Sequence, residues 1–266
     1  ASEDPKIRVQ AANAIARLGE PPLCEKLLPL LSSTDLRERE LVARTFERWK
    51  PDPCYKAMVG RLEVEDDVEV RGAIYKAIVA ATTGTSVRVS AMPGASSMAD
   101  LASAGVHTID TLAWPIAARK PGDDAAAADR AWTDAPARAL AALATQLARS
   151  QITLVPMLAS SMIQAFPQDV AKDGSLALLP EARQRALLDR ARAVPAADTR
   201  RARRVWTAQA AFLTRFVTAG GRIGIGTGFD LAGYPVPGAG VHTEMAALVR
   251  AGLTVELGPA WYDIDE

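Results

Sequence analysis

Apolar residues recur at helical spacing through the first third of the chain, in segments separated by short polar stretches. Three longer segments each open with an acidic residue four positions before an arginine, and the three pairs are Asp4/Arg8, Asp35/Arg39 and Asp67/Arg71. The arginines lie 31 and then 32 positions apart, with a shorter apolar segment between consecutive pairs. Two helices in a unit of nearly constant length predict an array of stacked helix pairs, a solenoid.

The pattern changes near Gly84, where a stretch rich in threonine and glycine ends the helical spacing. Beyond it, apolar or β-branched runs predict four strands, each followed by a helical segment; the runs cover residues 86–92, 106–114, 152–160 and 222–228. Successive strand–helix units predict parallel strands joined by crossover helices, either as half of an eight-stranded barrel or as a small open sheet. We therefore expect an α-helical repeat domain over residues 1–84 and an α/β domain of four parallel strand–helix units over residues 85–266.

The first domain resembles HEAT-type repeats of the short bacterial kind over about residues 4–82. In that family the aspartate caps the second helix of each unit and the arginine reaches toward the neighbouring unit, roles that suit both side chains. Charged pairs four positions apart also occur on any solvated helix face, but three recurrences at nearly one period favour the repeat. The resemblance implies a ridge for contacts with other proteins.

The second domain resembles the carboxyl-terminal half of the metal-dependent amidohydrolases, in particular the imidazolonepropionase-like and prolidase-like enzymes. The run RIGIGTG, a loop rich in glycine and proline, and the segment VHTEMAALVRAGLT follow the order of the family, with His242 and Glu244 in its His-x-Glu motif. Upstream, ADLASAGVHTIDTL and ITLVPMLAS resemble the segments that precede them in the family. The match covers about residues 86–255 and implies strands five to eight of a TIM barrel.

The same resemblance identifies the positions of the family's metal ligands. The family has a His, a second His and an Asp at the ends of strands five, six and eight, where this sequence has Ser90, Thr111 and Gly228. Zinc needs about three or four converging nitrogen, sulfur or oxygen donors, and without them the metal-activated water of the family has no source. We therefore expect no metal ligands and no cofactor, and we assign no catalytic residue. Asp110, one residue from Thr111, should point to the opposite face of its strand.

The resemblance implies four residues that bind a substrate or ligand: Ser90, Thr111, Asp230 and His242. Asp230 lies in the loop beyond the last strand, from which it could turn inward and restore a metal ligand. His242 opens the last helix in a region that borders the substrate pocket of the family; the alternative is a helix-start residue, with Glu244 supporting the first turn. The second histidine, His107, is expected at the surface or at the barrel rim.

Composition narrows the class of partner. Lysine plus arginine and aspartate plus glutamate both number 31, and a formal net charge of zero disfavours binding to nucleic acid or to a membrane surface. No apolar run reaches the roughly 20 residues of a membrane helix, and the polar start shows no signal-peptide pattern. We therefore expect a cytoplasmic protein, with a signal peptide removed before Ala1 as the alternative. Cys24 and Cys54 then favour two buried free thiols over a single disulfide.

Three functions remain open. The first is a pseudoenzyme, an amidohydrolase-like module that has lost its metal centre and serves in binding or assembly. The second is an active hydrolase of C–N bonds in amides, cyclic amides or dipeptides, with zinc or another divalent metal held by ligands from a missing segment or a partner chain. The third is a structural scaffold without a pocket.

Four strand–helix units cannot close a barrel, so two sheet edges and one side of the sheet stay open. We expect the helical repeats to pack over that side, or the chain to associate with itself or with a protein partner through the repeats or the open sheet edge. A small-molecule ligand is compatible with either arrangement.

Overall fold

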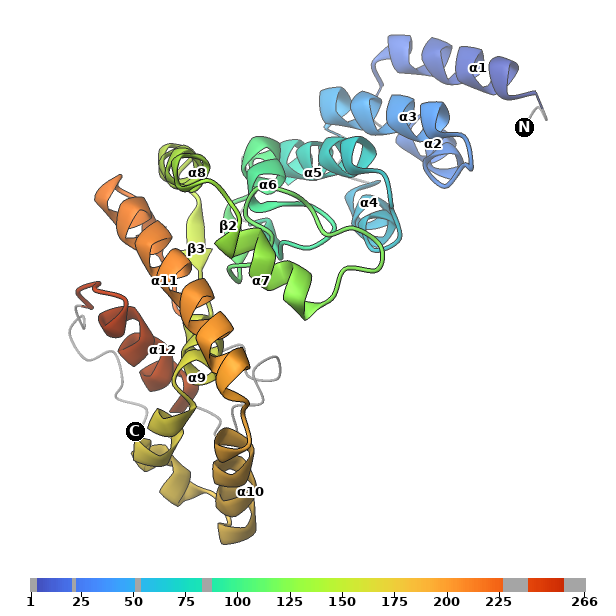
Figure 1. Ribbon diagram of the computed structural model, residues 1–266. Helices are drawn as coiled ribbons and strands as arrows, with labels where there is room; N and C mark the ends of the chain where they lie inside the picture. The colour runs from blue at the N-terminus through green and yellow to red at the C-terminus, as the bar shows by residue number, and fades with distance from the viewer. Residues whose placement is uncertain (1–3, 21–22, 51–53, 83–87, 227–238, 256–266) are drawn as a thin grey trace, which may run out of the picture.

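The computed structural model describes residues 4–20, 23–50, 54–82, 88–226 and 239–255, and it is mostly helical with one small parallel sheet (Figure 1). Five helices form the amino-terminal array: α1 Pro5–Leu18, α2 Cys24–Leu31, α3 Leu36–Trp49, α4 Tyr55–Leu62 and α5 Val68–Thr82. Helices α1, α3 and α5 pack side by side in that order, while α2 lies against α3 and α4 lies against α5. The predicted helix pairs are therefore present.

Aspartates start the three longer helices of the array. The side chain of Asp4 accepts a hydrogen bond from a backbone N–H at the start of α1 at 2.8 Å, and Asp35 does the same for α3 at 2.9 Å. Asp67 accepts from two N–H groups of α5 at 3.0 and 2.9 Å. These bonds satisfy N–H groups that no helical carbonyl reaches. The acidic residues of the sequence pattern therefore mark the helix starts.

Two of the three arginines of the pattern make contacts with a neighbouring unit. Arg8 Nε donates to Glu38 Oε1 at 2.8 Å, and Arg39 Nε donates to Glu65 Oε2 at 3.1 Å. Both glutamates are buried, so each arginine neutralises a charge that water does not reach. Arg8 and Arg39 thus reach the neighbouring unit as predicted, whereas Arg71 donates to the backbone carbonyl of Glu65, in the loop ahead of its own helix.

Cys24 and Cys54 are joined in a disulfide, so the expectation of two free thiols is wrong. They lie at the starts of α2 and α4, equivalent helices of consecutive units, and stacking of the units brings their Cα atoms to 6.3 Å. Stable disulfides are rare in reducing compartments. The cysteines therefore no longer support a cytoplasmic location, which stays a prediction.

The carboxyl-terminal part alternates strands and helices. In chain order its elements are β1 Ser90–Ala91, α6 Met98–Ala104, β2 Thr108–Asp110, α7 Ala125–Thr133, α8 Ala137–Arg149, β3 Thr153–Val155, α9 Leu158–Ala165, η3 Pro167–Lys172, η4 Gly174–Leu178, α10 Glu181–Arg192, α11 Ala196–Thr218, β4 Arg222–Ile223 and α12 Ala239–Arg250. The strands form one sheet in the order β1-β2-β3-β4, and every neighbouring pair is parallel. The predicted four parallel strands are therefore confirmed.

The strands are shorter than predicted, with two or three residues each instead of runs of seven to nine. Two of them end where the backbone turns to positive φ: Thr111 has φ 71° directly after β2, and Met157 has φ 49° directly before α9. A left-handed residue takes the chain out of the extended conformation. The apolar runs therefore continue past the strands into loops and, after β3, into a helix.

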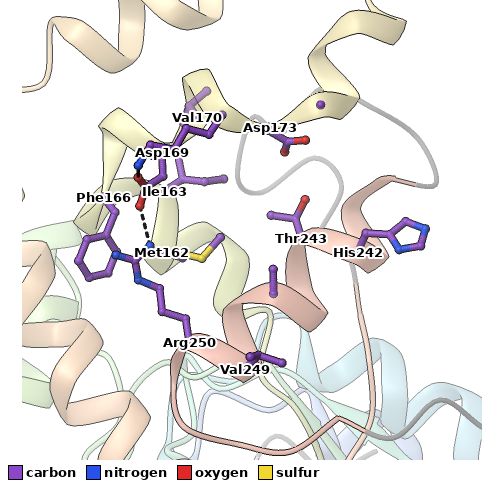
Figure 2. A pocket seen from close by; sticks show the side chains of 13 residues that line it. Met162, Ile163, Phe166, Asp169, Val170, Asp173, His242, Thr243, Val249 and Arg250 are labelled. Carbon is purple, nitrogen blue, oxygen red and sulfur yellow. Dashed lines mark hydrogen bonds and ion pairs between the residues drawn. The ribbon is translucent and has the colours of Figure 1, made fainter.

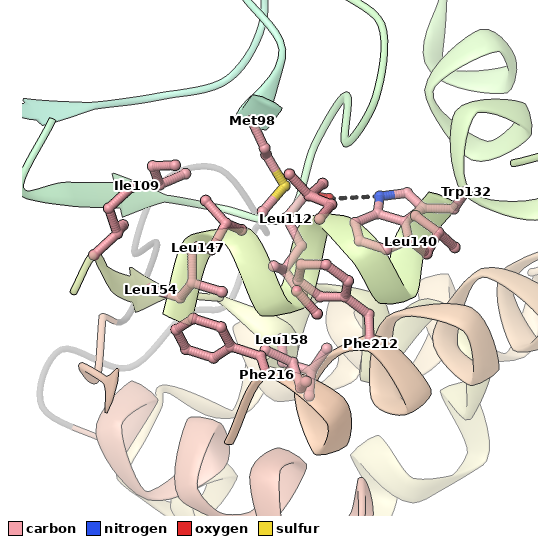
Figure 3. Close-up of a cluster of buried hydrophobic side chains, with 14 of the residues drawn as sticks. Met98, Ile109, Leu112, Trp132, Leu140, Leu147, Leu154, Leu158, Phe212 and Phe216 are labelled. Atoms are coloured by element: carbon pink, nitrogen blue, oxygen red, sulfur yellow. Dashed lines mark hydrogen bonds between the residues drawn. The ribbon is translucent and has the colours of Figure 1, made fainter. Parts of the chain in front are cut away.

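The two faces of the sheet differ in burial. Right-handed crossovers between strands in consecutive order place the connecting helices on one face. On that face Ile109 and Leu154 are fully buried, in one apolar core with Leu147 of α8 and Phe216 of α11 (Figure 3). The opposite face, called the open face below, carries exposed or half-buried side chains, namely Ser90, Thr108, Asp110, Thr153 and Val155.

The helical array meets the sheet unit through α5 and α6, and Val89 contacts the apolar cores of both parts. Helix α6 contributes Met98 and Leu101 to the core of the buried face, and Tyr75 of α5 packs against the same core. Within the described residues the array therefore extends the helical side and does not cover the open face. Of the two expected arrangements, packing of the repeats over that face is not found, and association of the chain stays a prediction. Gly84, the predicted domain boundary, lies outside the described residues. No helix of the described segments is long and apolar enough to cross a membrane.

Candidate functional site

Ser90 and Asp110 meet on the open face near the carboxyl ends of β1 and β2. Ser90 Oγ donates to Asp110 Oδ2 at 2.6 Å. The register explains the contact, because Ser90 lies opposite Thr108 and the residue two positions further on shares that face. Ligand sites of parallel sheets form at this edge. Asp110 is thus the partner of Ser90 at the candidate site, a role that the sequence analysis did not give it because it expected Asp110 on the face opposite to that of Thr111.

Thr111 is not part of this contact. Its backbone N–H donates to the Val155 carbonyl at 2.7 Å, and its φ of 71° is uncommon for a β-branched residue. Trp114 and Met157, which also follow strands, have positive φ as well. Unfavourable backbone conformations gathered at one edge of a sheet are typical of functional regions. The carboxyl edge of the sheet is therefore the first candidate site.

Glu244 belongs to α12 and is fully buried, and its carboxylate lies at the start of α9. Its carboxylate accepts hydrogen bonds from the backbone N–H groups of Leu158 at 2.8 Å and Ala159 at 2.7 Å. Helix α9 has no side-chain cap of its own, so Glu244 of α12 supplies one. Burial raises the pKa of Glu244, while the two backbone N–H bonds lower it by less. The residue therefore caps a distant helix instead of supporting the first turn of α12.

His242 lies in a different place, beside an apolar pocket between α9, η3 and α12 (Figure 2). The pocket has a volume of about 790 Å³, and its lining includes Met162, Ile163 and Val249. His242 is exposed and, in Figure 2, its ring points away from the other labelled side chains. The structure therefore does not bring His242 together with Ser90.

One end of this pocket is fixed by an aromatic and ionic cluster. The Arg250 guanidinium lies 3.5 Å from the ring centroid of Phe166, and its Nη1 pairs with Asp169 Oδ2 at 2.6 Å. Hydrogen bonds from Lys172 and Arg250 hold the pKa of Asp169 below its usual value. These charges are paired with one another, so the cluster orders the wall of the pocket and leaves its interior apolar.

The remaining candidates lie elsewhere. His107 accepts from the Val89 N–H through Nδ1 at 3.0 Å, and its partial burial, with the charge of Arg88, lowers its pKa. A neutral ring that accepts this bond joins β1 to β2, a structural role. Asp230, like Gly228, lies outside the described residues. In the part of the chain that the structure describes, no three His, Cys, Asp or Glu side chains gather closely enough to hold a metal ion.

Comparison with known proteins gave no match: no family model, no curated protein and no solved structure is significantly similar to this chain.

Proposed function

We propose that this chain is an amidohydrolase-related assembly module, a pseudoenzyme with HEAT-like repeats whose open face binds a second copy of the chain. The observation that carries the proposal is the sheet, in which parallel strands in consecutive order have helices of the described segments on one face only. Strands of a βα barrel are arranged in this way, and further strands enclose the second face. Ser90 and Thr111, at the positions of two family metal ligands, support the loss of catalysis.

The outer strands supply a second argument. Among the described strands, β1 and β4 each pair on one side only. A large apolar side chain follows closely after each of them, Met92 with 51% and Ile225 with 45% of its surface exposed. Unpaired strand edges and exposed apolar groups both favour association.

A second copy fits these edges by symmetry. A two-fold axis parallel to the strands brings β1 of one copy beside β4 of the other, and rotation about this axis keeps the direction of every strand. Eight strands then remain parallel, as closure of a βα barrel requires. The chain has equal numbers of acidic and basic residues, so no net charge opposes contact between copies.

Sedimentation velocity of the full chain tests the assembly. We expect a dimer, and we expect Thr108→Arg, in the middle of the open face, to make it monomeric because the bulk of the arginine and the lost hydration of its guanidinium oppose enclosure of that face. Thr214→Arg, on the exposed side of α11, is the matched control and should remain dimeric. A monomeric wild type, or a Thr108→Arg variant that dimerises equally well, contradicts the proposal.

Metal analysis tests the loss of catalysis separately. Mass spectrometry of purified and dialysed protein should find no stoichiometric zinc or iron, and the protein should not hydrolyse acyl-amide or dipeptide substrates. Stoichiometric metal that survives dialysis would instead support an active C–N hydrolase with ligands from a partner chain. In that case Asp110, which lies beside Ser90 on the open face, is the first residue to replace.

A further inference from the structure

A second pocket lies between η3, α10 and the start of α11, the region at which α10 leads into α11 in Figure 1. It has a volume of about 600 Å³, which is within the usual range for ligand pockets. Its lining contains three arginines, Arg192, Arg200 and Arg203, and no aspartate or glutamate of the described residues. This basic pocket is separate from the open face and from the apolar pocket beside α12.

One side of α11 forms a wall of the basic pocket. Ala196, Thr199, Arg200 and Arg203 all line it, and their spacing of three and four positions places them on one face of the helix. Leu188 and Arg192 of α10, four positions apart, line the facing wall in the same way. Both helices therefore turn an arginine toward the same space.

Arg203 is held at the η3 side of the pocket. Its Nε donates to the Ala165 carbonyl at 2.9 Å, and its guanidinium carbon lies 5.3 Å from the ring centroid of Phe166. Pro167, which follows directly, lines the pocket, so these contacts place the guanidinium next to the wall formed by η3. The bond to Ala165 uses Nε, so the two terminal nitrogens can donate to a ligand.

The positive charge of the pocket is only partly neutralised. Arg192 Nη1 pairs with Asp189 Oδ1 at 3.3 Å, but both side chains are exposed and such pairs are weak. No carboxylate of the described residues pairs with Arg200. The other acidic side chains of these three helices pair outside the pocket, Asp169 with Lys172 and Arg250, Glu181 with Arg185, and Asp198 with Arg201. Three arginines and one exposed aspartate leave an excess of two positive charges.

This excess suits a particular kind of anion. A phosphate monoester carries a charge of about −1.5 to −2 at neutral pH, and the planar fork of arginine binds phosphate through paired N–H···O bonds. Apolar side chains, among them Leu188 and Val194, form much of the remaining lining. They provide a surface for an apolar group attached to the phosphate.

We propose that the basic pocket binds a small organic phosphate monoester with an apolar group. The phosphate accepts hydrogen bonds from Arg200 and Arg203, and the apolar group lies against Leu188 and Val194. The site does not depend on assembly through the open face, because none of its residues lies on the sheet.

Phenyl phosphate is the probe, in isothermal titration calorimetry of the full chain. We expect saturable binding of one molecule per chain that weakens as the salt concentration rises. Inorganic phosphate lacks the apolar group and phenol lacks the charge, so each should bind at least about tenfold more weakly. Binding that does not saturate, or equal affinity for phenyl phosphate and either control compound, overturns the proposal.

Two variants separate the pocket from the basic surface around it. Arg200→Gln removes the guanidinium that no carboxylate neutralises, and it should fold because the side chain is exposed. Phenyl phosphate should bind it at least about tenfold more weakly, the effect of one lost charge-assisted hydrogen bond. Arg190→Gln is the matched control: it removes the same charge from the exposed surface of α10 outside the lining, and it should bind as the wild type does. Unchanged affinity in Arg200→Gln overturns the site, and an equal loss in both variants assigns the binding to a general basic surface instead.

Discussion

The contacts inside the helical array join residues that are close in the sequence, whereas the contacts inside the sheet unit join residues that are far apart in it. In the array, Arg39 and Glu65 pair across 26 positions, about one repeat. In the sheet unit, Glu244 reaches the N–H of Leu158 across 86 positions. Contacts between neighbouring repeats recur with the period of the sequence, whereas contacts in the sheet unit require most of that unit to be in place. A substitution that destabilises the array should therefore affect only the neighbouring helices. A substitution that destabilises the sheet unit should affect helices throughout that unit.

The largest effect is expected from Glu65→Ala. Glu65 is enclosed and pairs with Arg39 Nε at 3.1 Å and with Arg61 Nη2 at 2.8 Å. Its removal leaves the largely buried Arg61 without its carboxylate and leaves Arg39 with only the exposed carboxylate of Asp66. This change costs about 3–5 kcal/mol of unfolding free energy. Urea unfolding measures the loss, and hydrogen exchange should show it in α3–α5 and not around β2 and β3.

The exposed Glu63 is the matched control, two positions earlier in the sequence. Glu63→Ala should change the unfolding free energy by less than about 0.5 kcal/mol. If Glu65→Ala instead increases exchange equally in the array and the sheet unit, the two parts unfold together and the contrast between them is wrong.

The next effect concerns the disulfide. The bridge closes a loop with a sequence separation of 30, and loop entropy predicts that the double variant Cys24→Ala/Cys54→Ala loses about 3–4 kcal/mol of unfolding free energy. A reducing agent should lower the wild-type melting temperature and leave that of the variant unchanged. An equal melting temperature with and without reductant would show that the stacked helices, and not the bridge, carry the stability of the array.

The sequence predicted the array in more detail than the sheet unit because the array repeats its local rules. Asp35 caps its helix and Arg39 reaches the neighbouring unit, the two roles that the resemblance to HEAT-type repeats implies. The disulfide was missed although Cys24 and Cys54 are separated by nearly one period, because the cysteines were interpreted from their expected compartment instead of from their places in the repeat.

In the sheet unit, the sequence predicted the strands and their direction but not the contacts of the candidate site. Ser90 meets Asp110 only because of the register between β1 and β2, which nothing in either segment specifies by itself. Strand ends were also placed too late, since an apolar run does not reveal the positive φ of Thr111. Long-range geometry, and not residue type, decides these features.

The smallest effect is expected from Glu244→Gln. The amide oxygen can accept from one of the two N–H groups, of Leu158 or of Ala159, while the amide NH₂ faces the other N–H group. The variant should therefore lose about 1–2 kcal/mol of unfolding free energy. Hydrogen exchange should rise at the start of α9 and also in α12, because the two helices share this contact. Gln164→Glu, on the exposed side of α9, is a control for the change of charge.

The pH dependence of that loss shows which force dominates at Glu244. Burial raises the pKa of the folded state above the usual value of 4.5, so the protonated form favours folding. The stability that protonation of Glu244 contributes is fully present below about pH 4.5, and it is lost as the pH rises through the pKa of the folded state. The difference in unfolding free energy between wild type and Glu244→Gln should therefore shrink as the pH rises from 4 toward neutrality. A difference that grows would show that the two N–H bonds and the α9 dipole outweigh burial, and that the contact between α12 and α9 depends on the charge of Glu244.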